Sequence, residues 1–102
     1  MTTPELGATT RAALERLLMA AQGDDAQARM SADFLLAWWD PDLYGGFALT
    51  NLWEMDHEVA RACVLVFAWV AANRVHPMEI GYGPQFEALF TGSVGWGRYA
   101  TS

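Results

Sequence analysis

The residues that come closest to a catalytic motif are His57, Glu58 and Arg61, near the start of a predicted helix. In zinc proteases, two histidines four residues apart bind the metal, and a glutamate after the first histidine activates water. Arg61 stands where the second histidine would be, and a guanidinium does not bind zinc. We therefore interpret this segment as the acidic first turn of a helix, in which Glu58 pairs with Arg61 three residues later.

Five carboxylates in the middle of the chain offer the oxygen ligands that Ca²⁺ and Mg²⁺ prefer: Asp40, Asp42, Glu54, Asp56 and Glu58. Their spacing does not fit the loop of a calcium-binding helix-loop-helix. Turn formation and helix capping already account for Asp40, Asp42 and Asp56. We therefore predict neither a metal site nor a cofactor.

The single cysteine, Cys63, lies in the apolar stretch from Val59 to Ala72. A thiol in such a stretch behaves as a small buried hydrophobe, and its position along the helix turns it away from His57. The sequence contains no G-x-S-x-G motif and no glycine-rich phosphate-binding loop. We therefore predict no catalytic residues and a protein that is not an enzyme.

The net charge of the chain is concentrated in its middle third. The 102 residues include twelve acids and six bases, for a net charge of −6. Residues 30–60 contain six of the acids and no base, while the flanking segments nearly balance. The acidity argues against nonspecific nucleic-acid binding. The apolar content of 53% excludes a disordered tail, and the single cysteine excludes a disulfide scaffold.

The first predicted helix opens at a threonine cap, either in the segment Thr3-Pro4-Glu5 or at Thr9-Thr10. It is expected to end at Gly23, as a helix-terminating glycine. One stripe of the helix is apolar at helical spacing, and we expect it to be buried: Leu14, Leu17, Leu18 and Ala21.

The second predicted helix opens with a capping box formed by Asp24 and Gln27 and runs to about Trp39. Its apolar side is expected to comprise Ala26, Met30, Phe34, Ala37 and Trp38. Pro41 ends the helix because proline pushes the preceding residue out of helical conformation. Residues 43–47 then continue as a loop.

The third long helix is predicted over residues 57–73, with Asp56 as its cap and a brief helical turn before it that Thr50 or Asn51 caps. The run of residues 64–67 also suits a buried strand, but the flanking alanines and the length favour a helix. Because this helix is apolar almost all round, we expect it to be buried on all sides. It is then either the central helix of a small bundle or the seam of a dimer.

The remaining segments are shorter. We expect a loop over residues 78–83 and a short helix from Pro84 through Phe90, with Gly92 after it. Residues 93–102 show no periodicity and are predicted to form a loosely ordered tail, with Trp96 and Tyr99 docking on the body. The predicted fold class is therefore all-α: one domain over residues 1–102, a compact bundle of four to five helices around a central apolar helix at about 57–73.

The sequence predicts no membrane partner. Its longest apolar stretch contains Arg61 and is too short to span a bilayer. The first six residues have neither the basic nor the apolar part of a secretory signal. We expect a cytoplasmic protein.

Adjacent aromatic and acidic residues suggest a binding surface. The rings of Trp38 and Trp39 point in directions about 100° apart, so we expect one of them to reach the surface or to pack under residues 44–47. Tryptophan and tyrosine are enriched at binding hot spots, although core packing is their commoner role in a small domain. The candidate partner-binding residues are Trp39, Asp40, Asp42, Tyr44, Glu54, Asp56 and Glu58.

Five short segments form a recognisable pattern: Asp33-Phe34-Leu35-Leu36-Ala37-Trp38-Trp39, Gly45-Gly46-Phe47, Leu49-Thr50-Asn51-Leu52-Trp53, Gly81-Tyr82-Gly83 and Phe86-Glu87-Ala88-Leu89. In these segments the chain resembles, over about residues 12–90, a family of small uncharacterised bacterial proteins carried on integrative conjugative elements, plasmids and prophages of Proteobacteria. The resemblance implies a genetic context and no catalytic residue. Small accessory proteins of mobile elements often regulate transfer or block host defence.

Two functions are consistent with these observations. The first is a non-enzymatic inhibitor of a host defence complex, resembling an anti-CRISPR protein, that binds a basic surface of a CRISPR effector subunit stoichiometrically and contacts no nucleic acid directly. A base-free acidic segment complements such a surface and speeds encounter with it. The second is a regulatory or structural homodimer, in which the apolar helix forms the seam.

Overall fold

The computed structural model describes residues 5–92, and all regular structure in that range is helical. Four helices form the body: α1 (Gly7–Ala20), α2 (Ala26–Trp39), α5 (His57–Ala72) and α6 (Gly83–Gly92). Three single turns connect them: α3 (Pro41–Tyr44), α4 (Asn51–Glu54) and the 3₁₀ helix η1 (Pro77–Ile80). The predicted all-α bundle is confirmed. The predicted tail, with Trp96 and Tyr99, lies outside the described residues.

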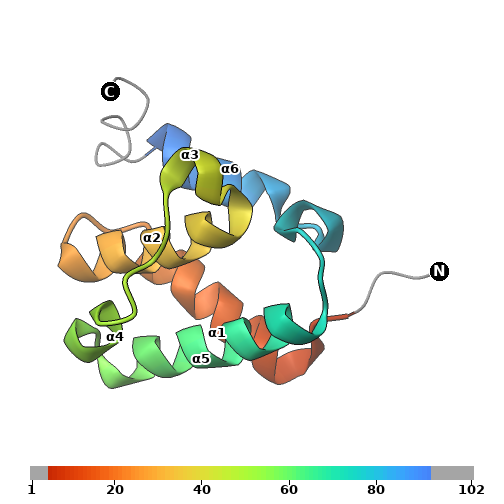
Figure 1. The fold of residues 1–102 in the computed structure, drawn as a ribbon, viewed down its shortest axis with the longest axis horizontal. Helices are drawn as coiled ribbons and strands as arrows, with labels where there is room; N and C mark the ends of the chain where they lie inside the picture. Colours follow the sequence, from red (N-terminus) through yellow and green to blue (C-terminus); the bar gives the residue numbers. More distant parts are fainter. Residues whose placement is uncertain (1–4, 93–102) are drawn as a thin grey trace.

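Helix α1 is the element around which the bundle packs. It lies along α5 on one side and contacts α2 on another (Figure 1). The predicted apolar stripe of α1 is buried as expected: Leu14, Leu17, Leu18 and Ala21. At the other end of the molecule, α6 and η1 pack together, and α6 contacts α2. No helix within residues 5–92 is long and apolar enough to cross a membrane.

The first helix begins and ends at positions other than those predicted. Leu6 occupies the N-cap position and makes no side-chain capping bond, while Thr9 lies inside the helix. Leu6 is buried, so tertiary packing rather than a polar cap sets the start, as is usual for helices in folded domains. The helix ends at Ala20, and Gly23 lies in the following turn, where its N–H donates to the Ala20 carbonyl over 3.3 Å.

The predicted capping box at the start of α2 is wrong. Asp25, not Asp24, is the N-cap, and its Oδ1 accepts the N–H of Ala28 over 2.9 Å. The amide of Gln27 is directed instead at the segment between α4 and α5. A tertiary contact has therefore taken the side chain that the local motif would have used.

The buried side of α2 is also displaced from the predicted one. Its fully buried residues are Ala28, Ser31, Ala32, Leu35 and Leu36. Met30, Phe34 and Trp38, which were predicted to face the core, are half-buried at its edge. Because α2 contacts α1, α3 and α6 at once, its apolar surface is wider than a single helical stripe.

Two predicted loops contain helical turns. Asp40 ends α2 and also caps α3, since its Oδ1 accepts the N–H of Leu43 over 3.2 Å. A proline at the first helical position favours such a turn. Pro77 does the same in η1, where the ring of His76 accepts the N–H of Met78 and the carboxylate of Glu79 accepts the N–H of His76. Residues 43–47 and 78–83 are therefore only partly loop.

The third long helix is not buried on all sides within the single chain. One face of α5 packs on α1 and is buried through Val59, Ala62, Cys63 and Val66. The opposite face is open, with Val64 57% and Phe67 62% exposed. Figure 1 shows α5 along one edge of the molecule. A bundle of this size has too few elements to cover a helix on every side.

Candidate protein-binding surface

The largest exposed aromatic side chain among the described residues belongs to Trp53, which is 82% accessible. Leu49, one turn earlier in the chain, is 68% accessible. Three exposed carboxylates follow, on Glu54, Asp56 and Glu58. We call these five residues the α4–α5 corner. The three carboxylates are among the binding residues predicted from the sequence and Trp53 is not, although Trp53 lies inside the base-free acidic segment.

Two anchors hold the α4–α5 corner against the body of the protein. The side chain of Gln27 on α2 donates from Nε2 to the carbonyl of Glu54 over 2.8 Å, and its Oε1 accepts the N–H of Asp56 over 3.0 Å. Between these two residues, Met55 is buried and its Sδ lies 3.8 Å from the Sγ of Cys63. The α4–α5 corner is therefore held in place by the two hydrogen bonds of Gln27 at the surface and by the buried side chain of Met55 inside.

The residues predicted to cap the helices of this region lie at the predicted positions, but their side chains do not cap the helices. Thr50 precedes α4 and Asp56 precedes α5, and neither side chain makes a capping hydrogen bond. The backbone N–H of Asp56 is satisfied by Gln27 instead. Without a capping role, the Asp56 carboxylate is exposed at the surface.

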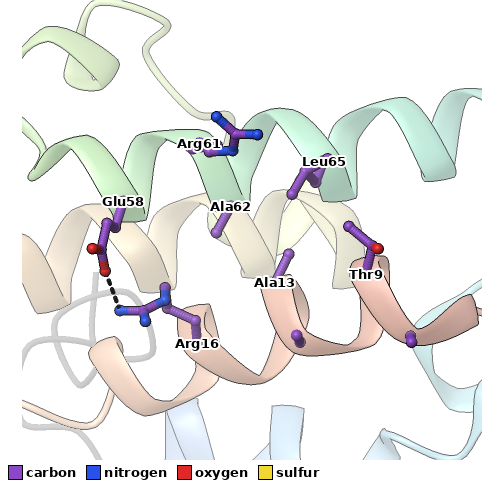
Figure 2. Close-up of a pocket in the computed structure, with 9 residues that line it drawn as sticks. Thr9, Ala13, Arg16, Glu58, Arg61, Ala62 and Leu65 are labelled. Atoms are coloured by element: carbon purple, nitrogen blue, oxygen red, sulfur yellow. Dashed lines mark ion pairs between the residues drawn. The ribbon is translucent and has the colours of Figure 1, made fainter.

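The predicted pairing of Glu58 with Arg61 does not occur. Glu58 forms an ion pair with Arg16 of α1, with an N–O distance of 3.2 Å, and the two side chains point toward one another across the helix interface (Figure 2). Both are more than half exposed, so this pair adds little stability. Arg61 is one of the residues that line the groove between α1 and α5 (Figure 2). Glu54 and Asp56 make no ion pair within residues 5–92.

The other predicted site residues form a separate group near α3. The ring of Trp39 is half-buried and stacks on Phe86 with a centroid separation of 5.6 Å, and it also contacts the ring of His76. Tyr44 is half-buried, and burial, followed by the nearby Asp40 carboxylate, raises the pKa of its phenol. Asp42 is exposed. Asp40 caps α3, and the ring of Trp39 packs on Phe86 and His76.

Helix α2 separates the two groups. Gln27 near its start contacts the α4–α5 corner, whereas Asp40 at its end caps α3. Thirteen residues of helix rise correspond to about 20 Å, and Figure 1 shows α3 and α4 at well-separated places in the molecule. The seven predicted residues therefore do not converge on one surface. Within residues 5–92, no group of three or more His, Cys, Asp or Glu residues is arranged to hold a metal ion.

Trp38 and Trp39 both pack on the same aromatic neighbour. Trp38 meets Phe86 edge-to-face at 5.8 Å and Trp69 at 6.3 Å. Its Nε1–H donates to the carbonyl of Val75 over 3.0 Å. Phe86 is fully buried, and the rings of Trp38 and Trp39 both pack against it from α2. Phe47, in the segment that follows α3, meets Phe34 of α2 edge-to-face at 5.2 Å.

A groove of about 580 Å³ lies between α1 and α5 (Figure 2). Four alanines of the two helices line it, and the Arg16–Glu58 ion pair lies at one end. The remaining lining residues are Thr9, Arg61 and Leu65.

The one cysteine is buried, as predicted. Cys63 is 1% accessible, and burial raises the pKa of its thiol to about 12. His57, by contrast, is exposed. A thiol with so high a pKa carries almost no thiolate at neutral pH, and the two residues lie on different faces of α5.

Comparison with known proteins gives a family and no activity. Residues 11–93 match a family described as a family of unknown function (DUF7673). The chain belongs to this family. The match includes the whole segment, about residues 12–90, over which the sequence resembles small uncharacterised bacterial proteins. No curated protein and no solved structure matches the chain.

Proposed function

We propose that the protein is a non-enzymatic binding factor that associates stoichiometrically with a protein partner through the α4–α5 corner. The exposure of Trp53 carries this proposal. An indole that is 82% accessible contributes little to the core, and leaving so large an apolar ring in water is unfavourable unless a partner covers it. The Gln27 tie and buried Met55 hold the ring on a fixed framework, which reduces the entropy lost on binding.

The charge around Trp53 indicates the chemistry of the partner. Glu54 and Asp56 lie on either side of the Met55 anchor and make no ion pair within the described residues. Residues 30–60 carry no base. Such a surface repels nucleic acid and attracts an arginine- and lysine-rich protein surface. A tryptophan at the centre with carboxylates at the rim matches the anatomy of binding hot spots.

The partner we favour is a subunit of a host defence complex such as a CRISPR effector, which binds nucleic acid in a basic channel. Carriage on mobile genetic elements, which the sequence resemblance implies, supports an inhibitor of this kind. Full mimicry of a nucleic-acid duplex is not part of the proposal. The acids lie in two groups about 20 Å apart along α2, so the α4–α5 corner is the main contact and Asp42 beside α3 a second, weaker one.

Binding to a basic partner can be tested with paired variants. Wild-type protein, Trp53→Ala and Met78→Ala are each immobilised and exposed to nuclease-treated lysate of a bacterial host, and retained proteins are identified by mass spectrometry. Met78 is 57% exposed on η1 and serves as a matched control. We expect a basic protein that wild type and Met78→Ala retain and that Trp53→Ala loses. The same proteins on all three columns would contradict the proposal.

The electrostatic part and the defence-inhibitor part need separate measurements. For the retained protein, affinity should fall at least tenfold between about 50 and 300 mM salt, since exposed charges are screened over about 10 Å. Expression of the chain in hosts with active CRISPR immunity should restore plaque formation by a targeted phage, and Trp53→Ala should abolish the effect. An affinity that does not depend on salt would contradict the proposal that the partner is basic. CRISPR immunity that stays unchanged in every host type would contradict the proposal that the protein is a CRISPR inhibitor.

A further inference from the structure

The open face of α5 has the residue spacing of a helix-pairing seam. Ala60, Val64, Phe67 and Ala71 follow one another at intervals of four, three and four residues, which is the hydrophobic repeat of two-stranded helix packing. Val64 and Phe67 are more than half exposed and Ala71 is exposed as well, while Ala60 at the start of the seam is half-buried against the core. Helix α1 covers the opposite face of α5. We infer that a second copy of this chain covers this face, so that α5 pairs with α5 in a two-fold dimer.

The charge distribution argues that the occupant is another copy. No carboxylate occurs between Glu58 and Glu79, although the whole chain carries a net charge of −6. Two copies that approach by the acidic segment repel one another, whereas the α5 face carries no negative charge after its first turn. Like-charge repulsion is therefore weakest along the seam from Arg61 onward, and at the first turn of the helix a cross-chain partner for Asp56 has to offset it.

Two charged side chains beside the seam indicate a parallel arrangement. Asp56 and Arg61 are both exposed, and neither makes an ion pair within the described residues. They lie five residues apart and flank the seam on opposite sides. In a parallel helix pair, flanking residues at this spacing meet across the interface, so that Asp56 of one copy faces Arg61 of the other.

The size of the face sets the expected strength of the dimer. Sixteen residues of helix are about 24 Å long and about 10 Å across, so a pair of α5 helices buries a few hundred Å² per copy. Stable interfaces bury about 800 Å² per partner. We therefore expect a reversible dimer with a dissociation constant on the order of 10 μM.

Sedimentation velocity from about 1 to 500 μM, a range that brackets a weak interface, tests the inference. The wild-type chain should move from monomer to dimer over this range. Phe67→Glu should weaken association at least tenfold, whereas Met19→Glu, at a 75% exposed position on α1, should change it less than twofold. Circular dichroism confirms that both variants stay folded, as expected for exposed sites. A wild-type chain that stays monomeric, or Phe67→Glu that dimerises normally, would overturn the inference.

A charge exchange tests the parallel arrangement. Arg61→Asp should weaken the dimer severalfold, and adding Asp56→Arg to it should restore the wild-type constant, because the pair is re-formed with its signs reversed. No recovery in the double variant would overturn the parallel pairing. Trp53→Ala should dimerise like wild type. The dimer and the proposed partner-binding function therefore fail independently of one another.

Discussion

Removing the amide of Gln27 should both destabilise the protein and loosen the α4–α5 corner. Gln27→Ala deletes the hydrogen bond to the Glu54 carbonyl at 2.8 Å and the one from the Asp56 N–H at 3.0 Å. At solvent-accessible positions each bond contributes about 0.5–1 kcal/mol. Alanine is the better helix former by a few tenths of a kcal/mol. The net loss is therefore about 1 kcal/mol, or about 4–8 °C in Tm for a domain of this size.

Thermal unfolding followed by circular dichroism measures this loss. The matched control is Gln85→Ala, at an exposed position of α6 whose side chain makes no hydrogen bond within the described residues. We expect the control to change Tm by less than about 2 °C, as surface substitutions usually do. Gln27→Ala should also weaken binding of the partner identified with Trp53. Equal Tm values for the two alanine variants would refute the assignment of Gln27 as an anchor.

A third variant separates the hydrogen bond from other effects. Gln27→Glu keeps the length of the side chain and the acceptor for the Asp56 N–H, but it places a carboxylate oxygen against the Glu54 carbonyl. We expect it to be at least as destabilising as alanine at pH 7. Below pH ~4, where an ordinary glutamate takes up a proton, its hydroxyl can donate to the carbonyl and the Tm difference from wild type should shrink. A constant difference at all pH values would contradict the geometry.

Three further predictions concern the core. Trp38→Phe keeps the ring contacts but loses the 3.0 Å hydrogen bond to the Val75 carbonyl. The free energy of unfolding should therefore fall by about 1–2 kcal/mol, and an unchanged Tm would contradict this expectation. Ser31 is fully buried, and its Oγ has no hydrogen-bond partner among the described residues; Ser31→Ala should therefore leave Tm unchanged or raise it, and a large fall would reveal a missed partner. Burial raises the pKa of Cys63 to about 12, so the unfolded thiol ionises first and stability should fall as pH rises from about 8.5. The free energy of unfolding of Cys63→Ala should fall less steeply with pH. Parallel curves of stability against pH for the two proteins would contradict the raised pKa of Cys63.

Local patterns predicted most of the long helices. The leucine stripe of α1 is buried as its spacing indicated, and α2 ends at Trp39 where Pro41 required it to end. Both patterns depend on residues near one another in the chain, so sequence periodicity and backbone sterics are enough to predict them. The short turns were harder, because a four-residue helix has no periodicity to detect.

The candidate site shows the limit of such patterns. Residue types identified an acidic segment, but its carboxylates divide between two ends of α2 once the helices pack. Gln27 was assigned to a local capping box and instead joins α2 to the α4–α5 corner. Glu58 was assigned to a neighbour one turn away and instead pairs with Arg16. In each case, a partner distant in sequence displaced the local one.

The sequence by itself determined the helical class of this protein, the position of its negative charge and the apolar character of α5, because these follow from composition and spacing. Only the tertiary structure decided which apolar residues are covered. Helix α1 buries one face of α5 and leaves Phe67 open, and the Met55 and Gln27 anchors hold α4 so that Trp53 projects into solvent. Exposure depends on which helices pack together, and a linear pattern does not contain that information.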